Sequence, residues 1–70
     1  MANVEAEMVA NVWKVLVAPG AEVAEGDTIV ILESMKMEIP VLAEDSGTLT
    51  RLHVAEGDVV QEGDLIAVIE

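Results

Sequence analysis

Apolar positions in this chain gather in short runs of β-branched and aliphatic residues, and glycine or aspartate separates one run from the next. The five runs span residues 12–17, 29–32, 39–42, 49–54 and 65–69. None of them is long enough for an amphipathic helix with its capping residues, whereas strands of about four to eight residues between glycine turns fit the pattern. The sequence therefore predicts an all-β fold.

The chain also contains an internal repeat with an offset of 37 positions. Residues 10–33 align with residues 47–70 without a gap. The identical pairs are Val17/Val54, Ala18/Ala55, Gly20/Gly57, Val23/Val60, Glu25/Glu62, Gly26/Gly63, Asp27/Asp64, Ile29/Ile66 and Glu33/Glu70. Such a duplication predicts two equivalent units related by a pseudo-twofold axis.

Each unit is predicted to contain a strand, a glycine turn, a short extended piece, a Gly-Asp turn and a second strand. Glycine is expected where the chain needs a positive φ. The four predicted turn glycines are Gly20, Gly26, Gly57 and Gly63.

The repeat further predicts which strand residues face the core. Positions that are apolar in both copies are expected to point inward, and positions that are polar in at least one copy are expected to point outward. The inward set is Val15, Val17, Leu52 and Val54, and the outward set is Lys14, Leu16, Arg51 and His53. Trp13 aligns with Thr50, so the repeat does not decide between a partly exposed and a core position for the Trp13 side chain.

Two such units are expected to close as a flattened antiparallel β-barrel or sandwich of two small sheets, because closure covers the strand edges that a single sheet leaves open. We expect one domain over residues 1–70, with both termini at the same end. Residues 34–37 have no counterpart in the second copy. They are predicted to form the tip of a protruding hairpin.

Composition narrows the range of functions. The 70 residues carry 14 Asp and Glu against three Lys and Arg, and the resulting net charge of -11 disfavours nucleic-acid and anionic-membrane partners. The absence of cysteine excludes disulfides and thiolate metal sites. The N-terminal residues lack the features of a secretory signal and no apolar run reaches membrane-spanning length, so we expect a cytoplasmic protein.

An enzymatic function is disfavoured by the small size and by the shortage of catalytic side chains. His53 is the only histidine, Ser34 and Ser46 are the only serines, and no nucleophile motif or phosphate-binding glycine loop is present. The acidic residues on both sides of Gly26 and of Gly63 indicate turn chemistry rather than calcium coordination.

Lys36 is one of only three cations and lies between Met35 and Met37 in a Glu-Ser-Met-Lys-Met-Glu segment. This segment, midway between two halves with Gly-Asp turns, resembles the biotinyl/lipoyl attachment domain family. The resemblance is closest to small single-domain bacterial biotin/lipoyl attachment proteins and to biotin carboxyl carrier domains of acyl-CoA carboxylases. It implies that a biotin protein ligase links biotin to Lys36 through an amide and recognises Met35, Met37 and Glu33. Glu33 and Glu38 are equally well explained as ordinary solvated residues.

The resemblance implies a non-catalytic carrier. Biotin on Lys36 would be carboxylated at a biotin carboxylase with ATP and bicarbonate, and a carboxyltransferase would pass the carboxyl group to an acyl-CoA. The two halves align without a gap, which indicates that the extra loop called the thumb is missing and leaves another acyl-CoA or keto-acid carboxylase open.

Two alternatives remain at this point. Lipoyl carriers usually have Asp and Ala where this chain has Met35 and Met37, so biotin is favoured and lipoate is the alternative cofactor. An unmodified lipoyl-like structural module would not need the Met-Lys-Met segment.

Overall fold

A computed structural model describes residues 2–70, which form eight strands joined by turns, with no helix among them. The strands are β1 (Ala2–Glu5), β2 (Ala10–Val15), β3 (Glu22–Val23), β4 (Thr28–Ser34), β5 (Met37–Leu42), β6 (Gly47–Leu52), β7 (Val59–Val60) and β8 (Leu65–Ile69). They build two antiparallel sheets with the strand orders β1-β8-β6-β3 and β5-β4-β2-β7. The predicted all-β fold with two small sheets is confirmed.

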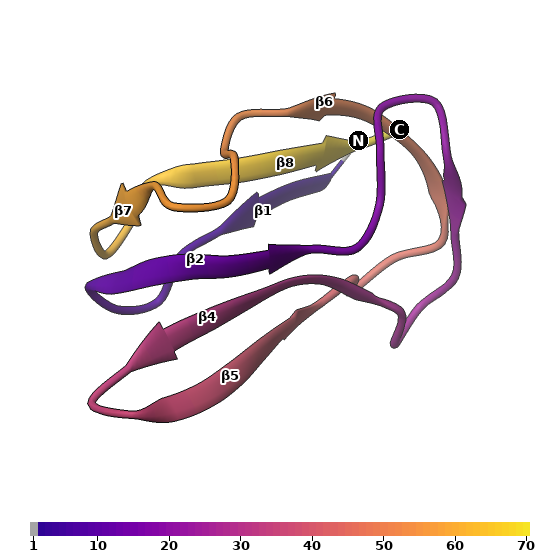
Figure 1. The fold of residues 1–70 in the computed structure, drawn as a ribbon. Coiled ribbons are helices and arrows are strands. Elements are labelled where there is room, and N and C mark those ends of the chain that lie inside the picture. Colours follow the sequence, from indigo (N-terminus) through magenta and orange to yellow (C-terminus); the bar gives the residue numbers. More distant parts are fainter. Residues whose placement is uncertain (1) are drawn as a thin grey trace.

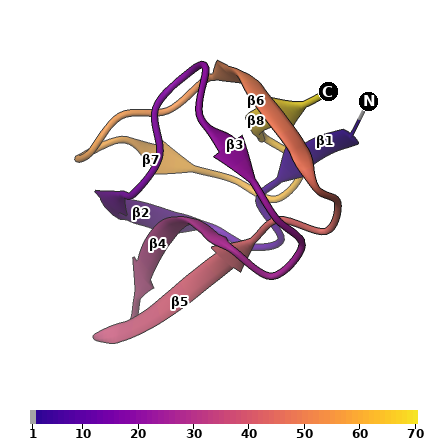
Figure 2. The same ribbon diagram turned by 90° about the vertical axis from the view of Figure 1, so that its right-hand side faces the viewer.

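The two sheets pack face to face, as Figure 2 shows with β8, β6 and β1 in one layer and β2, β4 and β5 in the other. Fully buried aliphatic side chains from both sheets fill the space between the layers. The largest of them are Ile29, Leu32, Leu49, Ile66, Ile69, Val12 and Val30. Burial of these side chains away from water is the main stabilising term of a fold this small.

The offset of 37 residues exchanges the two sheets. It maps β1, β2, β3 and β4 onto β5, β6, β7 and β8, so each strand of one sheet has an equivalent in the other. Backbone hydrogen bonds repeat as well, since Ala6 N donates to Asp64 O at 2.9 Å and Ala43 N donates to Asp27 O at 2.8 Å. The duplication therefore extends beyond the predicted repeat and includes β1, a strand that the sequence pattern did not indicate.

The predicted inward and outward sets are both confirmed. The four inward residues, Val15, Val17, Leu52 and Val54, are partly buried and pack against the core. The four outward residues, Lys14, Leu16, Arg51 and His53, are exposed.

A β-bulge in each copy decides the position of Trp13. The pairing of β2 with β4 passes from Val12 opposite Leu32 to Lys14 opposite Ile31, so Trp13 is an extra residue in β2. The equivalent irregularity in β6 lies at Thr50. A bulge turns two successive side chains outward, and Trp13 is accordingly 41% exposed.

The chain termini and the β4–β5 turn lie at opposite ends of the molecule (Figure 1). Under the pseudo-twofold, β8 and β1 correspond to β4 and β5. The end of β8 and the start of β1 therefore occupy the position that is equivalent to the β4–β5 turn. Among residues 2–70, no helix is available to cross a membrane.

Candidate modification site at the β4–β5 turn

The β4–β5 hairpin stays paired up to its last residues and closes with a two-residue loop. Glu33 lies opposite Glu38 and Ser34 opposite Met37, which leaves only Met35 and Lys36 in the loop. The tip is therefore narrower than the predicted residues 34–37, since Ser34 and Met37 belong to the strands. The β4–β5 turn, which contains Lys36, lies at the far end of the molecule from the start of β1 and the end of β8 (Figure 1).

Met35 and Lys36 both adopt left-handed backbone conformations, with φ of 52° and 65°. Two successive positive φ values in a two-residue loop are the pattern of a type I′ turn, whose twist matches that of the flanking strands. Gly, Asn and Asp normally occupy such positions because a larger side chain costs about 1 kcal/mol or more there. Met35 and Lys36 thus occupy a tight turn that backbone preference alone does not select.

The side chains around the turn are open to solvent. Met35 is 92% exposed, Met37 is 61% exposed, and Lys36 is also exposed. A flexible aliphatic stem carries the Lys36 amine into solvent, so a group added to the amine meets no packed structure of this chain.

Two carboxylates lie directly behind the turn on one face of the hairpin. Glu33 and Glu38 are cross-strand partners in β4 and β5, and both are exposed. Asn11 of β2 lies opposite Glu33 on the same side of the sheet. Like charges at directly opposed positions destabilise a strand pair, so this arrangement makes the region behind Lys36 strongly acidic rather than stabilising the hairpin.

The four predicted turn glycines have the expected backbone conformation. Their φ values are 94° for Gly20, 93° for Gly26, 95° for Gly57 and 89° for Gly63. The carboxylate of Asp27 accepts a hydrogen bond from Ala24 N at 2.8 Å, and that of Asp64 accepts one from Gln61 N at 2.8 Å. Asp27 and Asp64 thus stabilise their turns, and no group of three or more metal-binding side chains occurs in the described part of the chain.

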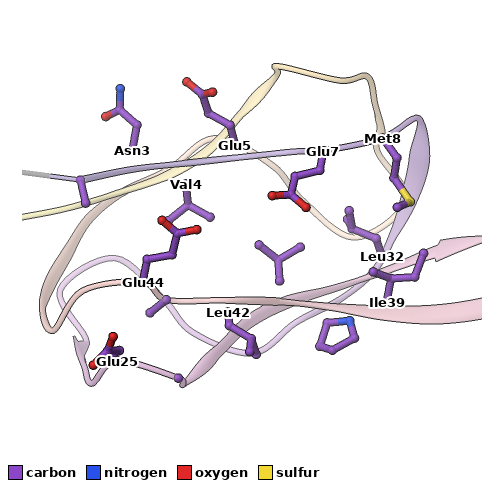
Figure 3. Close-up of a pocket in the computed structure, with 15 residues that line it drawn as sticks. Asn3, Val4, Glu5, Glu7, Met8, Glu25, Leu32, Ile39, Leu42 and Glu44 are labelled. Carbon is purple, nitrogen blue, oxygen red and sulfur yellow. The ribbon is translucent and has the colours of Figure 1, made fainter.

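A hollow of about 620 Å³ lies away from the hairpin tip. It lies between the edge strands β1 and β5, with Val4, Leu32 and Ile39 among its apolar lining residues and Glu7 and Glu44 among its acidic ones (Figure 3). None of residues 33–38 lines it. The Lys36 side chain therefore does not take part in this hollow.

A duplicated pair of small sheets that presents one exposed hairpin turn has the architecture of a carrier domain. The chain belongs to the biotin/lipoyl attachment family, whose model is described as "Biotin-requiring enzyme" and matches residues 2–69. Membership confirms the predicted resemblance and, at the level of the family, the biotin carrier class with biotin as its cofactor.

Individual relatives include both free-standing and multidomain proteins. The chain is 55% identical over 67 residues to the biotinylated protein TB7.3 homolog of Mycobacterium leprae, covering 96% of this chain and 94% of that protein. It is 45% identical over 67 residues to the biotin-dependent acyl-coenzyme A carboxylase alpha3 subunit of the same organism, covering 96% of this chain but 11% of the subunit.

A solved structure of the urea carboxylase of Kluyveromyces lactis shares the fold. The TM-score is 0.92 at 38% sequence identity, over 99% of this chain and 6% of the enzyme. The chain therefore corresponds to one small domain of these large carboxylases and to nearly the whole of the small biotinylated protein.

Proposed function

We propose that Lys36 is the residue of this chain that carries biotin, linked through an amide to its Nζ atom. The observation that carries the proposal is the position of Lys36 in a two-residue turn at the tip of an exposed hairpin, next to Met35 and Met37. Lys14, the other lysine, lies in β2 with its Nζ atom 5.4 Å from the centre of the Trp13 ring. Only Lys36 has the exposed tip position that suits a mobile arm.

The residues of the hairpin fit such a group. Attachment converts the hydrated ammonium of Lys36 into a neutral amide, which costs less to bury in the active site of a partner. Met35 and Met37 are flexible and polarisable, and they suit contact with more than one docking surface. Bound biotin would supply the group that accepts and releases a carboxyl group. This chain would only hold the biotin at an exposed position that partner enzymes can reach.

We infer that three kinds of enzyme act on this domain: a biotin protein ligase that recognises Met35, Met37 and Glu33, a biotin carboxylase, and a carboxyltransferase of an acyl-CoA carboxylase. The occurrence of homologous domains in carboxylases supports this kind of partner. The chain itself catalyses none of these steps, in keeping with its similarity to a small biotinylated protein. A cytoplasmic location fits all three partners.

Intact-mass measurement of the protein from its native host, with fragmentation to locate any adduct, tests the assignment. We expect one biotinyl group on Lys36. The Lys36→Arg variant is expected to carry none, whereas the matched Lys14→Arg variant is expected to be fully modified and both variants to keep the melting temperature of the wild type. Biotin on another residue would contradict the assignment of Lys36. A lipoyl group would show that the cofactor is lipoate instead of biotin, and an unmodified wild type would favour a structural module.

A further inference from the structure

The outer face of the sheet that carries Lys36 is unusually apolar. Lys14 lies opposite Ile31 and Ile31 lies opposite Pro40, so these three side chains share the side of the sheet that points away from the core. We call the apolar residues on this side the apolar face. They are Trp13, Leu16, Ile31, Pro40, Leu42 and Val59.

Most of the apolar face is open to solvent. Leu16 is 53% exposed, Leu42 46% and Val59 64%, in addition to the exposed ring of Trp13. The Lys14 ammonium group lies over that ring, 5.4 Å from its centre, a cation–π arrangement that favours keeping the ring on the surface. Clustered exposed apolar side chains of this kind mark interaction surfaces in soluble proteins.

The pseudo-twofold provides an internal comparison for this face. Each of its residues has an equivalent 37 positions away on the outer face of the other sheet. The pairs are Trp13/Thr50, Leu16/His53, Ile31/Val68, Pro40/Asn3, Leu42/Glu5 and Val59/Glu22. Five of these six equivalents are polar, and Figure 3 shows Asn3 and Glu5 directed away from the hollow on the β1 side and Leu42 directed away on the β5 side.

The fold therefore does not require apolar residues at these positions. The same backbone positions accept Thr, His and Asn in the other sheet, and four of the six apolar residues are exposed by 41% or more. Their exposed surface costs solubility unless another molecule covers it. Since the hairpin strands β4 and β5 form part of this sheet, a molecule that receives the tip of the hairpin also approaches the apolar face.

Charge indicates which molecule covers the face. Glu33 and Glu38 lie on the same side of the sheet, between the apolar face and the turn, so the partner needs basic side chains next to its apolar contact. A second copy of this chain does not supply them, because each copy carries a net charge of -11 and the copies repel.

A biotin carboxylase is expected to have the required charge. It binds ATP and bicarbonate, both anions, beside the point that the carrier arm must reach, and such sites are lined with Arg and Lys. A carboxyltransferase binds an acyl-CoA, whose phosphates lie at the far end of a long arm from the reacting acyl group. Basic residues at the entrance for the hairpin tip are therefore expected first of all in the biotin carboxylase.

We propose that the apolar face, together with Glu33 and Glu38, is the surface on which this carrier docks to its biotin carboxylase. The inference rests on the proposed function of Lys36. The new element is that the apolar face, and not the outer face of the other sheet, determines the affinity of this domain for the biotin carboxylase. Exposed Trp residues dominate the binding energy of many interfaces, so Trp13 is expected to contribute most.

The test exchanges residues of the apolar face for their own equivalents. The face variant carries Trp13→Thr, Leu16→His and Pro40→Asn, and the control variant carries Thr50→Ala, His53→Ala and Asn3→Ala on the opposite face. Each chain is fully biotinylated and then used as the substrate of the biotin carboxylase from the native host. We expect KM for the face variant to rise about tenfold or more with kcat little changed, and KM for the control to stay within about twofold.

Three further measurements keep the outcome interpretable. Melting temperatures show whether the variants fold, and Trp13→Thr alone replaces the triple variant if the latter does not. The rate of loading by biotin protein ligase is expected to be the same for all chains; a parallel fall in loading would assign the face to the ligase and overturn the proposal. A dimeric wild type that the face variant converts to a monomer would assign the face to a second copy.

An unchanged KM for the face variant would also overturn the proposal while leaving the carrier function intact. Failure of the proposed function gives a different result, because the wild-type chain would then remain unloaded or would not serve as a substrate once loaded.

Discussion

Met35 and Lys36 adopt a conformation that their side chains disfavour, and the surrounding hairpin holds them in it. Six cross-strand pairs join β4 to β5, from Thr28 opposite Leu42 to Ser34 opposite Met37. The pairs beyond the turn fix its length at two residues, and the right-handed twist of the strands then requires positive φ at both. Residues held in sparsely populated backbone regions are found where function selects the side chain.

Replacing Met35 by glycine is expected to stabilise the protein by about 1 kcal/mol and to slow its biotinylation. Glycine adopts the left-handed conformation without the penalty that Met35 carries at φ 52°, whereas the loss of the side chain removes a proposed contact of the ligase. Urea unfolding measures the first effect and the rate of loading by biotin protein ligase measures the second.

The matched control is Met37→Gly, which lies two residues away in β5. Glycine within a strand costs stability, so this variant is expected to be destabilised by roughly 0.5–1 kcal/mol. A loss of stability in Met35→Gly, comparable to that of the control, would show that the turn imposes no strain on Met35.

At the scale of the strand and turn, the sequence predicted what depends on residue type and missed what depends on pairing. Glycine spacing and repeated β-branched runs sufficed for the strands from β2 onward, for the turns and for the hairpin that presents Lys36. Strand β1 was not predicted because its four residues, Ala2–Glu5, contain a single large aliphatic side chain and gain their strand conformation from pairing with β8. The exposed position of Trp13 depends on the bulge, which alternation of side chains along a strand does not reveal.

The Gly-Asp turns depend on an aspartate that closes the turn from its own side chain. Asp27 N donates to Ala24 O at 3.0 Å while the Asp27 carboxylate accepts from Ala24 N at 2.8 Å. The same side-chain contact occurs from Ala55 N to Asp58 and from Gln61 N to Asp64. Each Gly-Asp turn thus contains two reciprocal hydrogen bonds between its aspartate and the residue three positions earlier. Residues 2–70 contain three such turns.

Asp27→Ala is expected to destabilise the domain by about 1 kcal/mol, because it leaves the Ala24 N–H without its acceptor. Asp27→Asn keeps a side-chain oxygen at the same place and is expected to lose about half as much or less. Glu25→Ala, in the same turn, serves as the control and is expected to stay within about 0.5 kcal/mol of the wild type. Urea unfolding of the four proteins checks the order, and equal losses for Asp27→Ala and Glu25→Ala would contradict this role of the Asp27 carboxylate.

At the scale of the whole molecule, negative charge is spread over a body whose length is similar to the range of electrostatic forces at low salt. The molecule measures 31 × 17 × 17 Å and carries a net charge of -11. The Debye length is about 30 Å at 0.01 M salt and about 10 Å at 0.1 M. At low salt every carboxylate therefore repels every other, and unfolding relieves this repulsion by separating them.

Two equivalent carboxylates illustrate the repulsion. Glu7 and Glu44 are related by the offset of 37 residues, and Figure 3 shows both directed into the hollow between β1 and β5. This hollow brings like charges from the two halves toward each other as a result of the duplication. Replacing both by glutamine is expected to raise stability at low salt and to weaken its dependence on salt.

Thermal unfolding at pH 7 in 0.01 M and 0.2 M NaCl is expected to show a melting temperature about 5 °C higher at the greater ionic strength, since about 1 kcal/mol corresponds to roughly that shift in a domain of this size. KCl at the same concentration is expected to give the same result, because screening depends on ionic strength and not on the cation. In the Glu7→Gln, Glu44→Gln variant the shift is expected to be smaller. A melting temperature of the wild type that is independent of salt would mean that repulsion between carboxylates is equally strong in the folded and unfolded chains. The high negative charge would then favour association with basic partners without lowering the stability of the fold.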